Sequence, residues 1–129
     1  MAPTHYSILI ADDEQSSRET LRDIIEPEGF QTVVVDSGEA ALDVVQERPI
    51  HLLVCDMYMQ RLTGLETLQL LRQMNALVPF ILVSGRVDEA LLRQALLAKA
   101  YTVLAKPVSK NVFLYTVARA LIKGLEQTA

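Results

Sequence analysis

The sequence has a single cysteine, Cys55, and no tryptophan. A lone cysteine has no partner in the chain, which excludes an internal disulfide framework and a cysteine-rich zinc site and fits a reducing compartment. Aromatic residues make up only 5% of the chain, which argues against a surface that stacks bases or sugar rings. The formal net charge is −4 and there is no basic run, so direct nucleic-acid binding is not expected.

Long apolar runs are absent as well. The longest, such as 78–83, span about six residues, against the roughly 20 needed to cross a bilayer. Residues 1–6 lack the basic-then-apolar pattern of a secretory signal. We therefore expect a cytoplasmic protein without a membrane partner. At 129 residues, half of them apolar, the chain has the size of one domain that needs neither metal nor disulfides to fold.

Five short apolar runs recur along the chain, and they are continuous rather than alternating. Continuous runs are typical of strands that are covered on both faces. Each gap is long enough for a helix and carries apolar residues at helical spacing. We expect an α/β domain with a parallel sheet between two helical layers. The predicted strands are 7–11, 32–35, 51–55, 79–83 and 101–105.

Capping residues predict where the helices begin. Ser37 and Asp88 precede apolar stripes, and Thr63 with Glu66 has the spacing of a capping box. In the fourth predicted helix we expect one buried stripe and, opposite it, an exposed Leu97. With Tyr101, Val108 and Tyr115, this leucine forms either a partner surface or ordinary packing. The expected buried stripe consists of Leu91, Leu92, Ala95 and Leu96.

Polar residues follow four of the five predicted strands. Asp12 and Asp13 follow the first, Asp56 the third, Ser84 the fourth and Lys106 the fifth. Taken singly, each has an ordinary explanation as a helix cap or turn residue. The carboxyl ends of parallel strands share one edge, where ligands bind, so we expect these groups to lie together.

Three carboxylates at one edge raise one another's pKa unless a cation intervenes. With oxygen ligands only, the expected ion is hard, Mg²⁺ or Mn²⁺. Lys106 and the Ser84 hydroxyl suit a phosphoryl group, and a carboxylate can be the nucleophile in phosphoryl transfer. Asp56 stands alone at its strand end and is the candidate nucleophile, whereas Asp12 and Asp13 suit the ion.

These residues resemble the receiver domain of two-component response regulators, a CheY-like module that histidine kinases phosphorylate. The resemblance covers 6–122 and leaves 1–5 as an N-terminal tail and 123–129 as a C-terminal tail or linker stub. It implies a flavodoxin-like three-layer sandwich with five helices and a five-stranded parallel sheet of order 2-1-3-4-5. The motifs that carry it are Asp12-Asp13, Asp56-Met57-Tyr58-Met59 followed by Gly64, Ser84-Gly85 and Lys106-Pro107.

The resemblance implies a role for each residue of the site. Asp56 would accept the phosphoryl group, and Lys106 and Ser84 would hold its oxygens. Tyr58 and Arg86, each two residues past a site residue, would flank the phosphate and set its lifetime.

A metal site is implied as well. Asp13, Asp56 and the backbone carbonyl of Tyr58 would ligate Mg²⁺ directly, and Asp12 partly through water. The bond between Lys106 and Pro107 would be cis, against about 5% for X-Pro bonds in general.

Signalling would proceed through a change of the face formed by the fourth helix, fifth strand and fifth helix. Val103 holds the family position for a switching aromatic, and we expect Tyr101, two residues earlier, to share its strand face. Ser84, Tyr101 and Val103 are the switch candidates. The implied partners are a histidine kinase or phosphotransfer protein of a phosphorelay, and an output domain or second copy on that face.

Three alternatives stay open beside this interpretation. Val103 and Gln60, which depart from the family pattern, would fit a pseudo-receiver that acts by constitutive protein contact. A phosphatase with an Asp nucleophile would need a second acid two residues after Asp56, where Tyr58 stands. A flavin or dinucleotide site would need a glycine-rich phosphate cradle, which is absent. We expect a protein that promotes its own phosphorylation and dephosphorylation, not a turnover enzyme.

Overall fold

The computed structural model describes residues 6–128. Strands and helices alternate along the chain, and every strand begins and ends within one residue of the predicted run. The elements are β1 (Ser7–Ala11), α1 (Gln15–Ile25), the 3-10 turn η1 (Glu26–Glu28), β2 (Gln31–Val35), α2 (Gly38–Glu47), β3 (Leu52–Asp56), α3 (Gly64–Gln73), β4 (Phe80–Ser84), α4 (Glu89–Leu97), β5 (Thr102–Ala105) and α5 (Lys110–Thr128).

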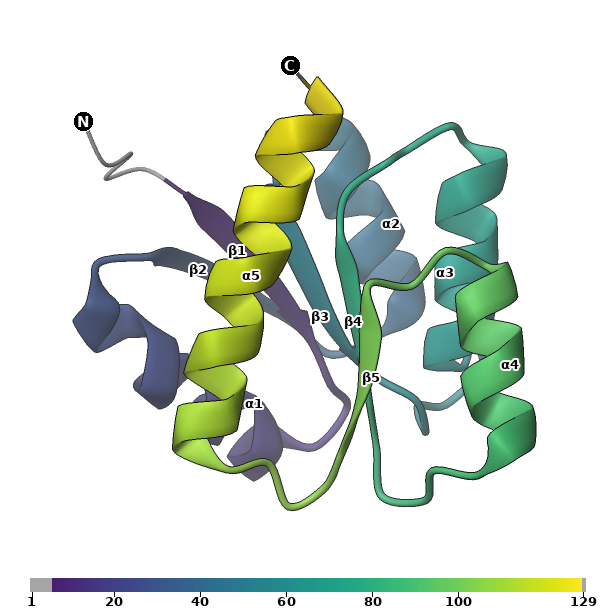
Figure 1. Ribbon diagram of the computed structural model, residues 1–129, viewed down its shortest axis with the longest axis horizontal. Helices are drawn as coiled ribbons and strands as arrows, with labels where there is room; N and C mark the ends of the chain where they lie inside the picture. Colours follow the sequence, from purple (N-terminus) through teal and green to yellow (C-terminus); the bar gives the residue numbers. More distant parts are fainter. Residues whose placement is uncertain (1–5, 129) are drawn as a thin grey trace.

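All neighbouring strands are parallel and the sheet order is β2-β1-β3-β4-β5, which confirms the predicted flavodoxin-like topology. In Figure 1, α1 and α5 cover one face of the sheet, and α2, α3 and α4 cover the other. The chain runs outward from β1 to β2 and then crosses back to β3. The carboxyl ends of β1 and β3 therefore flank the point where strand order reverses, the usual ligand site of such sheets.

Two hydrophobic cores fill the space between the layers. Residues such as Leu9, Leu53 and Leu82 belong to the core on the side of α2, α3 and α4. Ile8 and Val54 belong to the core that α1 and α5 cover. Because both faces of the central strands are buried, their sequences are apolar without alternation.

The predicted helix caps are confirmed. The Ser37 hydroxyl accepts a hydrogen bond from the Ala40 backbone N–H, and Asp88 caps α4 in the same way. Thr63 and Glu66 form the reciprocal capping box of α3. At α1 the capping residue Glu14 makes no side-chain cap bond. Helix α1 therefore begins without the side-chain cap that α2, α3 and α4 have.

The buried stripe of α4 is narrower than predicted. Leu91 and Ala95 are buried, but Leu92 is 40% and Leu96 65% exposed, so the expectation for these two leucines is wrong. The reason is the position of α4 over β5, a four-residue edge strand, where the sheet is too narrow to cover both flanks of the helix. Leu97 is 78% exposed, as expected.

Helix α5 continues past the expected boundary at 122. Residues 123–128, placed by sequence in a tail or linker stub, are helical. Gly124 lies so near Pro79 that a Cβ on Gly124 would lie 2.8 Å from the proline ring. This turn of α5 therefore packs against the segment that precedes β4. Residues 1–5, the expected N-terminal tail, and residue 129 lie outside the described residues. Between residues 6 and 128, no helix combines the length and apolar character needed to span a bilayer.

Candidate functional site

Three carboxylates meet at the carboxyl edge of the sheet. One oxygen each from Asp12, Asp13 and Asp56 lies within 4.8 Å of the others. Asp12 and Asp56 are buried, while Asp13 is exposed. The fold thus brings together residues from the ends of β1 and β3, as the strand-end pattern predicted.

Lys106 reaches the same cluster from the end of β5. Its Nζ lies 2.8 Å from Asp56 Oδ1, 3.3 Å from Asp12 Oδ2 and 3.2 Å from the Ser17 hydroxyl oxygen. An ammonium has three N–H donors, and here each has an acceptor. The peptide bond from Lys106 to Pro107 is cis, as the resemblance implied.

Burial and charge act in opposite directions on the pKa values of this pair. Burial raises the pKa of Asp56; the hydrogen bond and charge of Lys106 lower it, and the nearby Asp12 and Asp13 raise it further. The net result is a raised pKa. Burial alone would lower the pKa of Lys106, but the hydrogen bond and charge of Asp56, with help from Asp12, raise it above the ordinary lysine value. Lys106 is therefore held as a cation.

Hydrogen bonds hold both the side chain and the backbone of Asp12 in place. Its Oδ1 accepts a hydrogen bond of 2.9 Å from the Glu14 backbone N–H. Its backbone carbonyl accepts a hydrogen bond of 2.8 Å from the Arg18 guanidinium. Its backbone N–H donates to the Val35 carbonyl and so continues the β1–β2 ladder. The exposed Asp13 accepts one bond, at 3.3 Å, from the backbone N–H of Gln60. A ligand would therefore meet a rigid Asp12 and a more adjustable Asp13.

The loop after Asp56 approaches α3 closely at Gly64. A Cβ on Gly64 would collide with the backbone carbonyl of Asp56 and with the Leu82 side chain. The Gly64 N–H donates to the Met57 carbonyl at 2.9 Å, which closes the loop. Glycine is required here by the close approach of two backbones. Tyr58, in this loop, is 56% exposed.

Ser84 is fully buried at the end of β4. Its hydroxyl donates to the Arg86 carbonyl at 2.7 Å and accepts from the Arg86 N–H at 3.2 Å. The single hydroxyl proton is thus used within its own loop. Arg86 is exposed beside it. Binding of an anion by Ser84 would require this loop to rearrange.

Tyr101 and Val103 lie on different sides of the sheet. Val103 packs against the core under α4, whereas Tyr101 packs against the core under α5. The expectation that they share a strand face is wrong, because β5 begins only at Thr102 and Tyr101 lies in the preceding bend. The alternation of side chains holds only within a strand.

Two residues near the site were missed at the sequence level. Asp36 directly follows β2 and, with Asp13, Gln60 and Arg61, lines a small hollow beside the carboxylates. The strand-end rule would have found Asp36 had it been applied to all five strands. Ser17, the neutral partner of Lys106, left no signal, because one serine in a helix is common.

The donor set fits a hard divalent cation. Carboxylate oxygens are the ligands that Mg²⁺ and Mn²⁺ prefer, and the three Asp side chains lie close enough to share one ion. Cys55 is adjacent in sequence, but burial, followed by the charges of Asp56 and Asp12, raises the pKa of its thiol far above the ordinary value. The thiol therefore stays protonated and adds no soft ligand.

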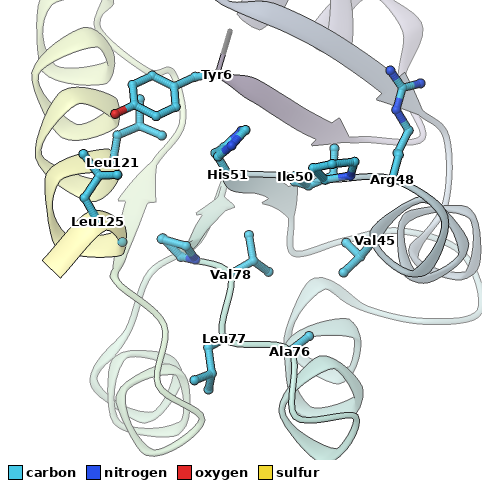
Figure 2. A pocket seen from close by; sticks show the side chains of 13 residues that line it. Tyr6, Val45, Arg48, Ile50, His51, Ala76, Leu77, Val78, Leu121 and Leu125 are labelled. Carbon is cyan, nitrogen blue, oxygen red and sulfur yellow. The ribbon is translucent and has the colours of Figure 1, made fainter. Parts of the chain in front are cut away.

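A second hollow lies at the opposite edge of the sheet. It has a volume of about 400 Å³ and lies between the amino ends of the strands and the last turns of α5. Figure 2 shows Leu121 and Leu125 on one side of it, with Tyr6 and His51 above. The His51 Nδ1 accepts a hydrogen bond of 3.0 Å from the Ser7 N–H. The hollow shares no residue with the carboxylate cluster.

Over most of its length, the chain is similar to known proteins. Residues 8–118 match the family model described as response regulator receiver domain. Response regulator RR06 of Streptococcus pneumoniae is 34% identical over 117 residues, which cover 91% of this chain and 53% of that protein. Transcriptional regulatory protein CpxR of Escherichia coli is 37% identical over 82 residues, 64% of this chain and 34% of CpxR.

A solved structure supports the fold. The CheY-like response regulator receiver domain protein from Methanospirillum hungatei superposes with a TM-score of 0.89 at 21% identity, covering 95% of this chain and 98% of that one. The chain spans about half the length of RR06 and about a third of CpxR. The similarity therefore concerns one part of these longer relatives.

Proposed function

The chain belongs to the response regulator receiver domain family, and we propose that it is a phosphorylation-controlled switch in which Asp56 accepts a phosphoryl group. The donor would be a histidine kinase or a phosphotransfer protein. The convergence of Asp12, Asp13, Asp56 and Lys106 at one edge of the sheet carries this proposal. A carboxylate nucleophile beside a fixed cation is the arrangement that phosphoryl transfer to Asp requires.

In the proposed step, a carboxylate oxygen of Asp56 attacks phosphorus. The new O–P bond forms as the N–P bond of the donor phosphohistidine breaks, and the electron pair returns to the imidazole nitrogen. The Lys106 ammonium offsets the negative charge of the incoming phosphoryl oxygens. Its raised pKa keeps that charge in place.

The acidic residues would hold the metal ion. Asp12, Asp13, Asp56 and the backbone carbonyl of Tyr58 are the proposed ligands of Mg²⁺ or Mn²⁺. When bound, the ion supplies positive charge that neutralises phosphoryl oxygens. Without it, three carboxylates face one ammonium, and an anionic donor is repelled.

The chain would not turn over external substrates. The position two residues after Asp56 holds Tyr58, which has no carboxyl group to serve as a general acid or base. Tyr58 and Arg86 are both exposed at the rim, where they would control the access of water to the phosphoryl group. They are thus proposed to set the lifetime of the phosphorylated state.

Signalling would use the loop after β4. Phosphorylation adds negative charge and acceptor oxygens, for which the Ser84 hydroxyl would leave the Arg86 carbonyl. This change would bias the face formed by α4, β5 and α5, where Leu96, Leu97 and Tyr115 are exposed. An output domain or a second copy of the chain is the proposed partner of that face. The side chain that couples the loop to the face would be Val103 or Tyr101.

The test is Mg²⁺-dependent phosphorylation by acetyl phosphate, followed by intact mass. The wild type is expected to gain one phosphoryl unit, and Asp56→Asn none. Asp36→Asn is the matched control, because Asp36 is a carboxylate at the same rim outside the cluster, and it should be phosphorylated normally. An unmodified wild type would instead favour the pseudo-receiver, which acts by constitutive contact.

A further inference from the structure

Among residues 6–128, the Ser17 hydroxyl is the only neutral acceptor of the Lys106 ammonium. Its oxygen lies 3.2 Å from Nζ, and the two residues are 89 positions apart in sequence. The other two acceptors are the carboxylates of Asp12 and Asp56. Ser17 belongs to α1 and is partly buried. It thus contacts the site from a helix that contributes no other group to the ammonium.

The position of Ser17 is itself well determined. The next residue, Arg18, donates from its guanidinium to the Asp12 carbonyl at 2.8 Å and from its backbone to the Glu14 carbonyl at 3.1 Å. These bonds fix the first turn of α1 against the end of β1. Ser16, the preceding residue, is exposed and donates its hydroxyl proton to Glu14 at 2.9 Å. Two adjacent serines therefore have different environments, and only Ser17 contacts Lys106.

Because the Ser17 hydroxyl is neutral, its role during phosphoryl transfer differs from that of the two carboxylates. When Asp56 forms its bond to phosphorus, the carboxylate that holds Lys106 most closely becomes part of an acyl phosphate. The ammonium then has to turn toward phosphoryl oxygens without leaving the site. Ser17 forms no covalent bond in this step and adds no charge that would compete for the ammonium. It can hold Nζ throughout the transfer.

We infer that Ser17 is a positioning residue for Lys106, holding the ammonium at the phosphorylation site from α1. The inference rests on the proposed function of Asp56 and adds a residue outside the strand-end set. Loss of one hydrogen bond of typical net strength corresponds to roughly a two- to tenfold change in an equilibrium or rate constant. Ser17→Ala is therefore expected to slow phosphorylation by acetyl phosphate at saturating Mg²⁺ by roughly three- to tenfold.

Three variants separate positioning from a general effect on α1. Ser17→Ala removes the acceptor, Ser17→Thr keeps a hydroxyl, and Ser16→Ala removes the neighbouring hydroxyl that does not contact Lys106. Alanine is a better helix former than serine, so α1 is expected to form in both alanine variants. Ser17→Thr should restore the rate to within about twofold of wild type, and Ser16→Ala should stay within the same range.

A second measurement needs neither metal nor phosphoryl donor. In the unphosphorylated protein, the ¹H–¹⁵N NMR signal of the Lys106 ammonium reports its hydrogen bonds. Ser17→Ala should shift and broaden this signal, because the freed N–H exchanges with water. Ser16→Ala should leave it unchanged, and Ser17→Thr should keep it close to the wild-type position.

The two measurements distinguish failure of the inference from failure of the proposed function. An unchanged ammonium signal in Ser17→Ala overturns the inference, even if the wild type is phosphorylated. A wild type that gains no mass overturns the proposed function, while a lost signal in Ser17→Ala would still support the contact. Equal slowing by Ser16→Ala and Ser17→Ala would also overturn the inference, since the effect would then belong to the helix.

Discussion

Lys106 and Asp56 form an ion pair of 2.8 Å across the end of β4, which lies between their strands in the sheet. The Lys106 ammonium offsets part of the negative charge of the carboxylate cluster. The Lys106 ammonium and a divalent cation would therefore both bind the carboxylates of Asp12 and Asp56.

Removing this ammonium should strengthen metal binding while weakening phosphorylation. Lys106→Met is expected to bind Mg²⁺ about tenfold more tightly, because a cation no longer shares Asp12 and Asp56. Isothermal titration with MgCl₂ measures the change. Lys110→Met is the control, because Lys110 is exposed at the start of α5. Equal or weaker Mg²⁺ binding by Lys106→Met would show that the ammonium does not compete with the ion.

The raised pKa of Asp56 predicts a specific dependence of stability on pH. Burial is the main cause of the shift, and Asp12 and Asp13 add to it. The unfolded chain releases this proton near the ordinary pKa of about 3.9, whereas the folded chain still holds it. The contribution of Asp56 to the free energy of unfolding is therefore most favourable below that value and falls as pH rises through the raised pKa.

Asp56→Asn removes this pH-dependent contribution to the free energy of unfolding. Without Mg²⁺, the unfolding free energy of Asp56→Asn relative to wild type should increase from about pH 4 to pH 7. Urea unfolding at several pH values measures it, and the difference between the two proteins cancels groups that titrate in both. A relative stability that declines over this range would reverse the assigned direction of the shift.

The narrow stripe of α4 separates residues that stabilise the fold from residues available to a partner. Leu91→Ala is expected to cost about 2–4 kcal/mol of unfolding free energy, because Leu91 is buried in the core. Leu97→Ala should stay within about 0.5 kcal/mol of wild type, because the side chain is already in water. Chemical denaturation compares the two. A large loss for Leu97→Ala would place that residue in the core instead.

Arg72 joins the ends of two helices to the start of β4. Its half-buried guanidinium donates at 2.8 to 3.3 Å to four backbone carbonyls, which belong to Ala76, Val78, Ala98 and Lys99. Arg72→Met keeps the apolar stem but leaves these carbonyls without their charged donor. It should lower the unfolding free energy by about 2–4 kcal/mol.

The matched control for Arg72 is Arg93 on α4. Its pair with Glu89 is exposed, so Arg93→Met should change the unfolding free energy by less than about 1 kcal/mol. Equal effects of the two substitutions would mean that the carbonyls find other donors when Arg72 is removed.

Much of the fold was predictable because the relevant forces act locally. Continuous apolar runs marked the strands, and Ser37, Thr63 and Asp88 marked helix starts through bonds to nearby backbone groups. Polar residues at strand ends indicated the site, because parallel strands share their carboxyl edge. The predicted cluster of Asp12, Asp13 and Asp56 is confirmed.

The order of the elements and the residue types at the site follow from local sequence, since spacing and capping are encoded within a few neighbouring positions. The tertiary structure sets which neighbours each group meets. It paired Lys106 with Ser17, exposed Leu96 at the edge of the sheet and turned Tyr101 away from Val103. These outcomes depend on contacts between distant segments. The periodicity of apolar residues within one helix or strand carries no information about which other segment packs against it.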